Sequence, residues 1–193
     1  ELDVFTGPWL VMGRVIQFGF LGLVGLSLFL SHRHSEPMSF LRKQSLRALT
    51  VFAAAMLVTA GTWLMVPDSY VRFGILHLAS ASILIGALLI SSVPLTLAGI
   101  FLSLAMSALP LGTSVPTSLL IPFGFTPPGF YTLDYFPLFP WLAVVLTGIV
   151  AGRLLDGLDL LSPSKKPIVL PMLEALGRHS LLAYLIHQPI FLG

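Results

Sequence analysis

The sequence contains no cysteine and few charged residues. The absence of cysteine from all 193 residues excludes disulfide bonds, cysteine-ligated metal sites and a thiol nucleophile. Asp, Glu, Lys and Arg together make up 9% of the chain, whereas a soluble domain carries about 25%. A chain with so few charges cannot cover a water-facing surface with polar groups, which argues against a soluble domain.

Other functional signals are also scarce. The net charge of +2 is too small to indicate nucleic-acid binding. The sequence shows no glycine-rich phosphate loop and no Ser-His-Asp order. The nearest approach to a metal motif is the pair His32 and His34, which we interpret as part of a solvated loop. We therefore predict neither a nucleic-acid partner nor a bound metal ion.

Apolar residues dominate the chain. They make up 56% of the residues, and the mean hydropathy is +0.96. Because a membrane-spanning helix needs about 20 mainly apolar residues, we predict an all-α, polytopic transmembrane bundle that forms a single domain over residues 1–193. Its six predicted helices are Trp9–Leu30, Leu46–Val66, Phe73–Ile90, Leu95–Leu109, Leu138–Leu155 and Leu176–Phe191. The Pro- and Gly-rich stretch from Pro110 to Pro137 is predicted to be an extramembrane loop.

Basic residues indicate the orientation of the bundle. Eight of them fall near the ends of two connecting segments: Arg33, Arg42, Lys43, Arg47, Arg153, Lys165, Lys166 and Arg178. The positive-inside rule places these segments in the cytoplasm, so Glu1 and Gly193 are expected outside. Since a chain that starts outside needs one more preceding helix if its true N-terminus is cytoplasmic, we interpret the sequence as part of a longer protein.

Four ionisable side chains are predicted to lie near the outer end of the bundle: Arg14, Arg72, His77 and Asp134. Intramembrane ionisable groups are costly and usually serve function or pair with one another. We expect the four to converge there, with an Asp134–Arg pair and His77 facing a cavity. The alternatives are an interfacial, snorkelling Arg14 and a hydrogen-bonded structural His77.

Two glycine patterns indicate close helix packing. Gly19, Gly22 and Gly25 recur every third residue in the first segment, and Gly148 and Gly152 form a small-residue motif in the fifth. Arg153, which follows the second pattern, is interpreted as a cytoplasmic anchor.

The last segment carries a polar stripe. Ser180, Tyr184 and His187 share one helical face, and Gln188 lies beside them. Pro189 leaves the carbonyl of the residue four positions earlier without its helical partner. We expect the stripe to face other helices, either as a cavity wall or as a buried hydrogen-bond network.

Several of these stretches together resemble one family. "FGILHLASASIL" (73–84), "DYFPLFPWLAVVLTGIVAGR" (134–153) and "LGRHSLLAYLIHQPI" (176–190) are similar to the bacterial relatives of heparan-alpha-glucosaminide N-acetyltransferase. "GRVIQFGFLGLVGLSLFLSH" (13–32) resembles the second helix of that family. The order and spacing also agree, and the resemblance covers nearly the whole chain.

The resemblance implies an integral membrane enzyme that moves acetyl from cytosolic acetyl-CoA to an extracytoplasmic amino sugar or glycan. It also implies a catalytic His at the outer end of a first helix, near an Asp-x-x-Arg-Gly-like motif. Neither is present in this sequence, so the catalytic base is expected to lie outside it or to be lost. The supporting catalytic candidates are His77, His187, Arg14 and Asp134, and those for acetyl-CoA are Arg72, Tyr184, Gln188 and Arg178.

Two other functional classes remain open. A non-catalytic subunit of a larger membrane complex would use the same fold as a packing module, with membrane proteins and lipid as its partners. A transporter would also explain intramembrane His and Arg, although the sequence shows no inverted repeat. The acceptor of an acetyl group is not specified by any motif.

Overall fold

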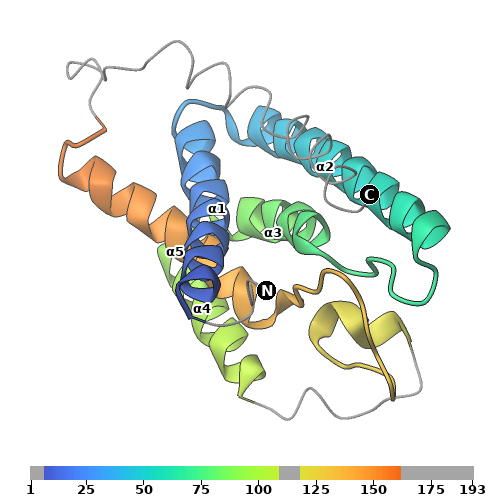
Figure 1. Cartoon of the computed structure of the whole chain (residues 1–193). Helices are drawn as coiled ribbons and strands as arrows, with labels where there is room; N and C mark the ends of the chain where they lie inside the picture. The colour runs from blue at the N-terminus through green and yellow to red at the C-terminus, as the bar shows by residue number, and fades with distance from the viewer. Residues whose placement is uncertain (1–6, 109–117, 162–193) are drawn as a thin grey trace.

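The computed structural model describes residues 7–108 and 118–161, and these ranges are built of helices (Figure 1). The elements are α1 (Gly7–Arg33), α2 (Pro37–Met65), α3 (Ile75–Leu89), α4 (Val93–Ser107), the short 3-10 helix η1 (Ser118–Phe123) and α5 (Leu138–Gly157). The all-α class predicted from hydropathy is therefore confirmed.

Within the described residues, three helices are long and apolar enough to cross a membrane: α1, α2 and α5. Helices α3 and α4 have 15 residues each, which spans about 22 Å at 1.5 Å per residue. The predicted count of six helices is not matched, because the described ranges contain five α-helices and 176–191 lies outside them. The third helix was predicted from apolar composition alone to run from Phe73 to Ile90, but both of these residues lie outside α3.

Helices α1 and α5 lie against each other in the same direction, and glycine makes this possible. A Cβ atom on Gly148 would collide with the carbonyl oxygen of Gly22, and one on Gly152 would meet the ring of Phe29. A Cβ on Gly25 would likewise meet the α5 backbone. The predicted close packing is thus confirmed for Gly25, Gly148 and Gly152, and the Gly22 backbone takes part in it. A Cβ on Gly22 itself or on Gly19 would meet nothing within 4 Å, and the prediction is wrong for Gly19, which makes no such contact.

The core lies where α3 packs between α2 and the α1–α5 pair (Figure 1). Its fully buried side chains include Leu21, Leu28, Leu78, Ile83, Leu146 and Ile149. The outer faces of the long helices are apolar as well, since Leu57 on α2 is 67% exposed and Val15 on α1 is 65% exposed. Such surfaces suit lipid and not water, so the protein is an integral membrane protein.

The ends of α1, α3 and α5 meet at one end of the bundle. Arg33 forms a salt bridge with Asp156, and Arg153 donates a hydrogen bond to the carbonyl oxygen of Ile90, the C-cap residue of α3. The guanidinium of Arg153 also lies 5.9 Å from the centre of the Phe29 ring. Arg153 of α5 therefore contacts both α1 and the end of α3. The interpretation of this residue as a cytoplasmic anchor did not include these contacts.

Candidate active site at the start of helix α3

Two loops meet where α3 begins, at the end of the bundle opposite Arg33. Phe73 and Tyr135 form an isolated parallel β-bridge, and the N–H of Phe136 donates to the carbonyl oxygen of Phe73 at 3.0 Å. The N–H of Leu133 donates to the carbonyl oxygen of Ser69 at 2.9 Å. These backbone bonds bring Asp134 to the first turn of α3, although the two are far apart in the chain.

The carboxylate of Asp134 binds the start of α3. Its Oδ2 atom accepts a hydrogen bond from the N–H of Ile75 at 2.9 Å, one of the N–H groups that a helix leaves unpaired at its positive end. A Cβ on Gly74 would collide with this carboxylate, so residue 74 must be small. The carboxylate thus binds the backbone, and it forms no ion pair with an arginine of the described ranges, contrary to expectation.

Burial sets the protonation behaviour of this loop. Burial raises the pKa of the Asp134 carboxyl above its ordinary value, and the hydrogen bond from Ile75 opposes that rise. Burial also raises the pKa of the neighbouring Tyr135 phenol, whose hydroxyl donates to the carbonyl oxygen of Ile121 at 2.8 Å.

His77 uses both ring nitrogens within the fold. Its Nδ1 atom accepts from the N–H of Gly74 at 3.3 Å, and its Nε2 atom lies 3.4 Å from Oγ1 of Thr59. The Thr59 hydroxyl donates to the carbonyl oxygen of Val71 at 2.8 Å, so it is free to accept from His77. This order of donors assigns the neutral tautomer with hydrogen on Nε2.

The surroundings of His77 are closed. The side chain is 5% exposed and packs against the rings of Phe52 and Phe73. The void bounded by His77 and Asp134 is too small for a water molecule. The cavity expected beside His77 is therefore not open in this structure, and the geometry fits a residue that positions α2, α3 and the loop before α3.

Arg72 has aromatic neighbours and an unused donor. Its guanidinium lies 5.0 Å from the centre of the Tyr70 ring and 5.4 Å from that of Phe130, distances typical of cation–π contacts. The Nε atom is buried and has no hydrogen-bond partner within the described ranges. Among the predicted residues, Arg72 therefore offers the clearest positive charge beside the α3 start.

A hollow of about 270 Å³ lies next to this cluster. It is lined by Met56, Thr59, Ala60, Trp63 and Tyr70. Thr59 connects the hollow to His77, and Tyr70 connects it to Arg72. Sequence reasoning missed these lining residues, although the spacing of Thr59 and Trp63 by four positions is a signal that both lie on one face of α2.

Arg14 has its described contact at the start of α5 and not with the other three predicted residues. Its Cζ atom is 5.8 Å from the centre of the Trp141 ring, which in turn packs on Phe136 and Phe18. Arg72, His77 and Asp134 thus come together around the start of α3, whereas Arg14 joins α1 to the start of α5.

The remaining candidates, Arg178, Tyr184, His187 and Gln188, lie outside the described residues. Within the described ranges, no three His, Asp or Glu side chains come close enough to hold a metal ion.

Comparison with known families decides the assignment. A family model described as "Heparan-alpha-glucosaminide N-acetyltransferase, catalytic" matches residues 1–189. The chain belongs to this family. No curated protein and no solved structure matches it. Membership in the heparan-alpha-glucosaminide N-acetyltransferase catalytic family agrees with the long apolar helices, and acetyl-CoA is the acetyl donor of that family.

Proposed function

We propose that the protein transfers acetyl from cytosolic acetyl-CoA to the amino group of an extracytoplasmic sugar or glycan. The family match over residues 1–189 is the observation that carries this proposal. Three helices long enough to span a membrane support it, as does a polar cluster at the end opposite the Arg33–Asp156 pair. We place that cluster on the extracytoplasmic side of a bacterial inner membrane.

The chemistry assigns different roles to the clustered residues. An amine must lose a proton as it attacks a thioester, and the developing oxyanion needs a donor or a positive charge. Arg72 fits the second need, because its buried Nε is unpaired within the described ranges. His77 fits a positioning role, since both of its nitrogens are engaged.

The catalytic base and the remaining residues of the acetyl-CoA site are then expected outside the cluster at the start of α3. We assign His187 a supporting role, with Arg178, Tyr184 and Gln188 as contacts for acetyl-CoA. Arg14 and Asp134 act through packing and through the α3 start. The hollow beside Trp63 and Tyr70 suits the acceptor, because it opens next to Arg72 and has aromatic walls.

The proposal is tested with protein purified from membranes, labelled acetyl-CoA and a panel of amino-sugar acceptors. Arg72→Gln is expected to lower kcat by about 10²-fold, the lower range for losing an oxyanion donor. Arg42→Gln, at an exposed position near the other end of α2, is the matched control and should leave kcat unchanged. Equal turnover by both variants would remove Arg72 from the site.

A non-catalytic membrane subunit is the second candidate function. It is favoured by the closed void and the fully engaged nitrogens of His77, which leave no free histidine at the described α3 start. In that case the wild-type protein transfers acetyl to no acceptor of the panel, and it co-purifies with other membrane proteins in a stable complex.

A further inference from the structure

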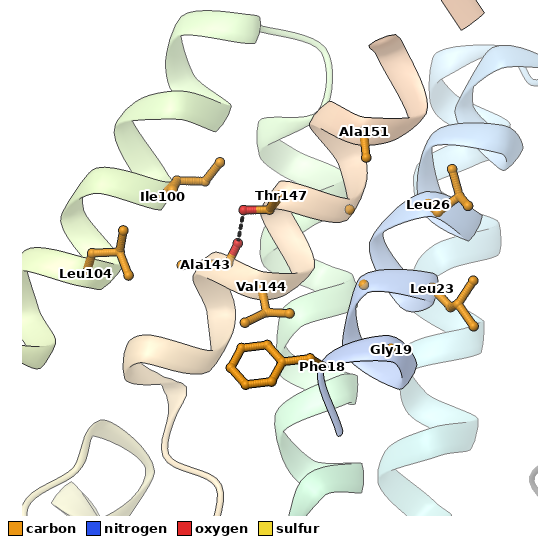
Figure 2. A pocket seen from close by; sticks show the side chains of 12 residues that line it. Phe18, Gly19, Leu23, Leu26, Ile100, Leu104, Ala143, Val144, Thr147 and Ala151 are labelled. Carbon is orange, nitrogen blue, oxygen red and sulfur yellow. Dashed lines mark hydrogen bonds between the residues drawn. The ribbon is translucent and has the colours of Figure 1, made fainter. Parts of the chain in front are cut away.

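An open groove runs between α1, α4 and α5 (Figure 2). Its volume is about 610 Å³, within the range of roughly 300–1,000 Å³ found for ligand sites. Phe18 and Gly19 line it from α1, Ala143 and Thr147 from α5, and Ile100 and Leu104 from α4. The groove is separate from the cluster at the start of α3.

The groove exists because α1 and α5 meet through small residues. The backbone contact between Gly22 and Gly148 brings the two helices together. Gly19 and Ala143 then add little or no side chain to the floor of the groove. The larger side chain of Leu104 on α4 forms one of its walls (Figure 2).

The lining calls for a hydrocarbon occupant. Among the described lining residues, Thr147 alone carries a side-chain hydroxyl, which donates to the carbonyl oxygen of Ala143 at 2.8 Å (Figure 2). The lining side chains therefore need no polar partner from an occupant. A helix with a polar stripe would lose hydrogen bonds in this groove, whereas a lipid chain would lose none.

A cation lies above the groove on the same face of α1. Arg14 precedes Phe18 by one helical turn, about 6 Å along the axis. Its guanidinium lies over the Trp141 ring, and that ring packs on Phe18 at 5.2 Å between centres. Arg14 is exposed and forms no ion pair within the described ranges. Guanidinium is well suited to phosphate.

We propose that this groove binds one hydrocarbon chain of an anionic phospholipid, whose phosphate contacts Arg14. The orientation inferred from basic residues places this lipid in the outer leaflet. The aromatic pair of Trp141 and Phe18 separates the phosphate from the chain, as aromatic side chains do at membrane interfaces. The lipid site does not depend on acetyl transfer, and it stands whether or not the protein is an enzyme.

Photocrosslinking locates the lipid directly. The protein is reconstituted in phosphatidylethanolamine vesicles that contain trace phosphatidylglycerol with a photoactivatable group in its acyl chain. Crosslinked peptides are identified by mass spectrometry. The expected result is labelling of 18–26 and 143–151 above the labelling of the lipid-facing surface at Leu57. Uniform labelling of all apolar surfaces would overturn the proposal.

Two variants separate the chain site from the phosphate site. Gly19→Leu places a larger side chain in the groove, from a position where a Cβ meets no heavy atom of another element within 4 Å. It should reduce labelling of 143–151 to the level at Leu57. Gly13→Leu is the matched control, since its Cβ is equally unobstructed and Gly13 does not line the groove. Labelling of 143–151 in this control should equal that in the wild type.

Arg14→Gln tests the phosphate contact. One interfacial arginine contributes about 1 kcal/mol of attraction to anionic lipid. The preference for labelled phosphatidylglycerol over labelled phosphatidylcholine should therefore fall about fivefold. An unchanged preference would contradict the role of Arg14. Crosslinks from the groove to a second copy, or to another segment of the chain in place of lipid, would contradict the lipid site as a whole.

Discussion

Asp134 and Ile75 are joined by a hydrogen bond of 2.9 Å across 59 positions of sequence. The carboxylate binds the first N–H of α3, and backbone bonds between the two loops hold it in place. The loop before α5 therefore stabilises the start of α3, and a substitution at residue 134 is expected to affect both the loop and the helix.

Asp134→Ala should destabilise the protein. The substitution leaves the N–H of Ile75 without its acceptor in a partly buried place, which costs about 1–3 kcal/mol. Asp134→Asn keeps an acceptor oxygen and should unfold near the wild-type temperature. Thermal unfolding in detergent compares the two variants. Equal losses in both would mean that the negative charge, and not the hydrogen bond, stabilises α3.

The same residue predicts a pH dependence. Burial raises the pKa of the Asp134 carboxyl in the folded protein. Its contribution to stability is therefore fully present below the unfolded-state pKa and is lost as the pH rises through the folded-state pKa. Asp134→Asn lacks this titration. The free energy of unfolding of the wild type minus that of Asp134→Asn should decrease with rising pH. A difference that increases with pH would reverse the sign assigned here.

His77 is predicted to be a neutral residue that positions helices. Nitrogen NMR of labelled histidine should show hydrogen on Nε2 and none on Nδ1, because Nδ1 accepts from Gly74. His77→Ala should lower the free energy of unfolding by about 1–3 kcal/mol. His77→Gln should recover part of that loss, since Gln at the third helical position can accept from the N-cap N–H. No recovery would argue against the capping role.

The contact between α1 and α5 predicts a strong effect of one methyl group. Gly148→Ala would place a Cβ against the carbonyl oxygen of Gly22, and overpacking of this kind costs about 1–3 kcal/mol. Gly13→Ala is the control, because a Cβ there meets nothing within 4 Å. It should be neutral or slightly stabilising. Thermal unfolding that affects both variants equally would refute the proposed contact.

Hydropathy predicted the helical class, because an apolar run long enough to span a membrane must pair its backbone groups internally, as a helix does. It predicted the short fourth helix, since Leu95–Leu109 has the same length as α4, but it made the third helix longer than α3 is. The start of α3 depends on Gly74 and on the Asp134 bond, which comes from a distant loop. The start of α4 is marked locally, because Ser92 accepts from the N–H of Leu95.

The candidate site was predictable in part. Arg72, His77 and Asp134 were expected together, and the loops do bring them to the start of α3. Their partners were not predictable, because Thr59 and the Gly74 N–H depend on how α2 packs on α3. Arg14 was expected in the same cluster, but its described contact is with Trp141 at the start of α5, and this contact could not be predicted from position along the helix.

Acetyl transfer by this protein is expected to cross the membrane, and its sidedness can be measured in vesicles. Inverted membrane vesicles, whose cytoplasmic face is outside, are loaded with a glucosamine-type acceptor and given labelled acetyl-CoA from outside. We expect labelled N-acetylated acceptor inside the vesicles while the CoA moiety stays outside. Product formed only when acceptor and acetyl-CoA share the outer solution, or no product with any acceptor of the panel, would contradict transfer across the membrane by this protein.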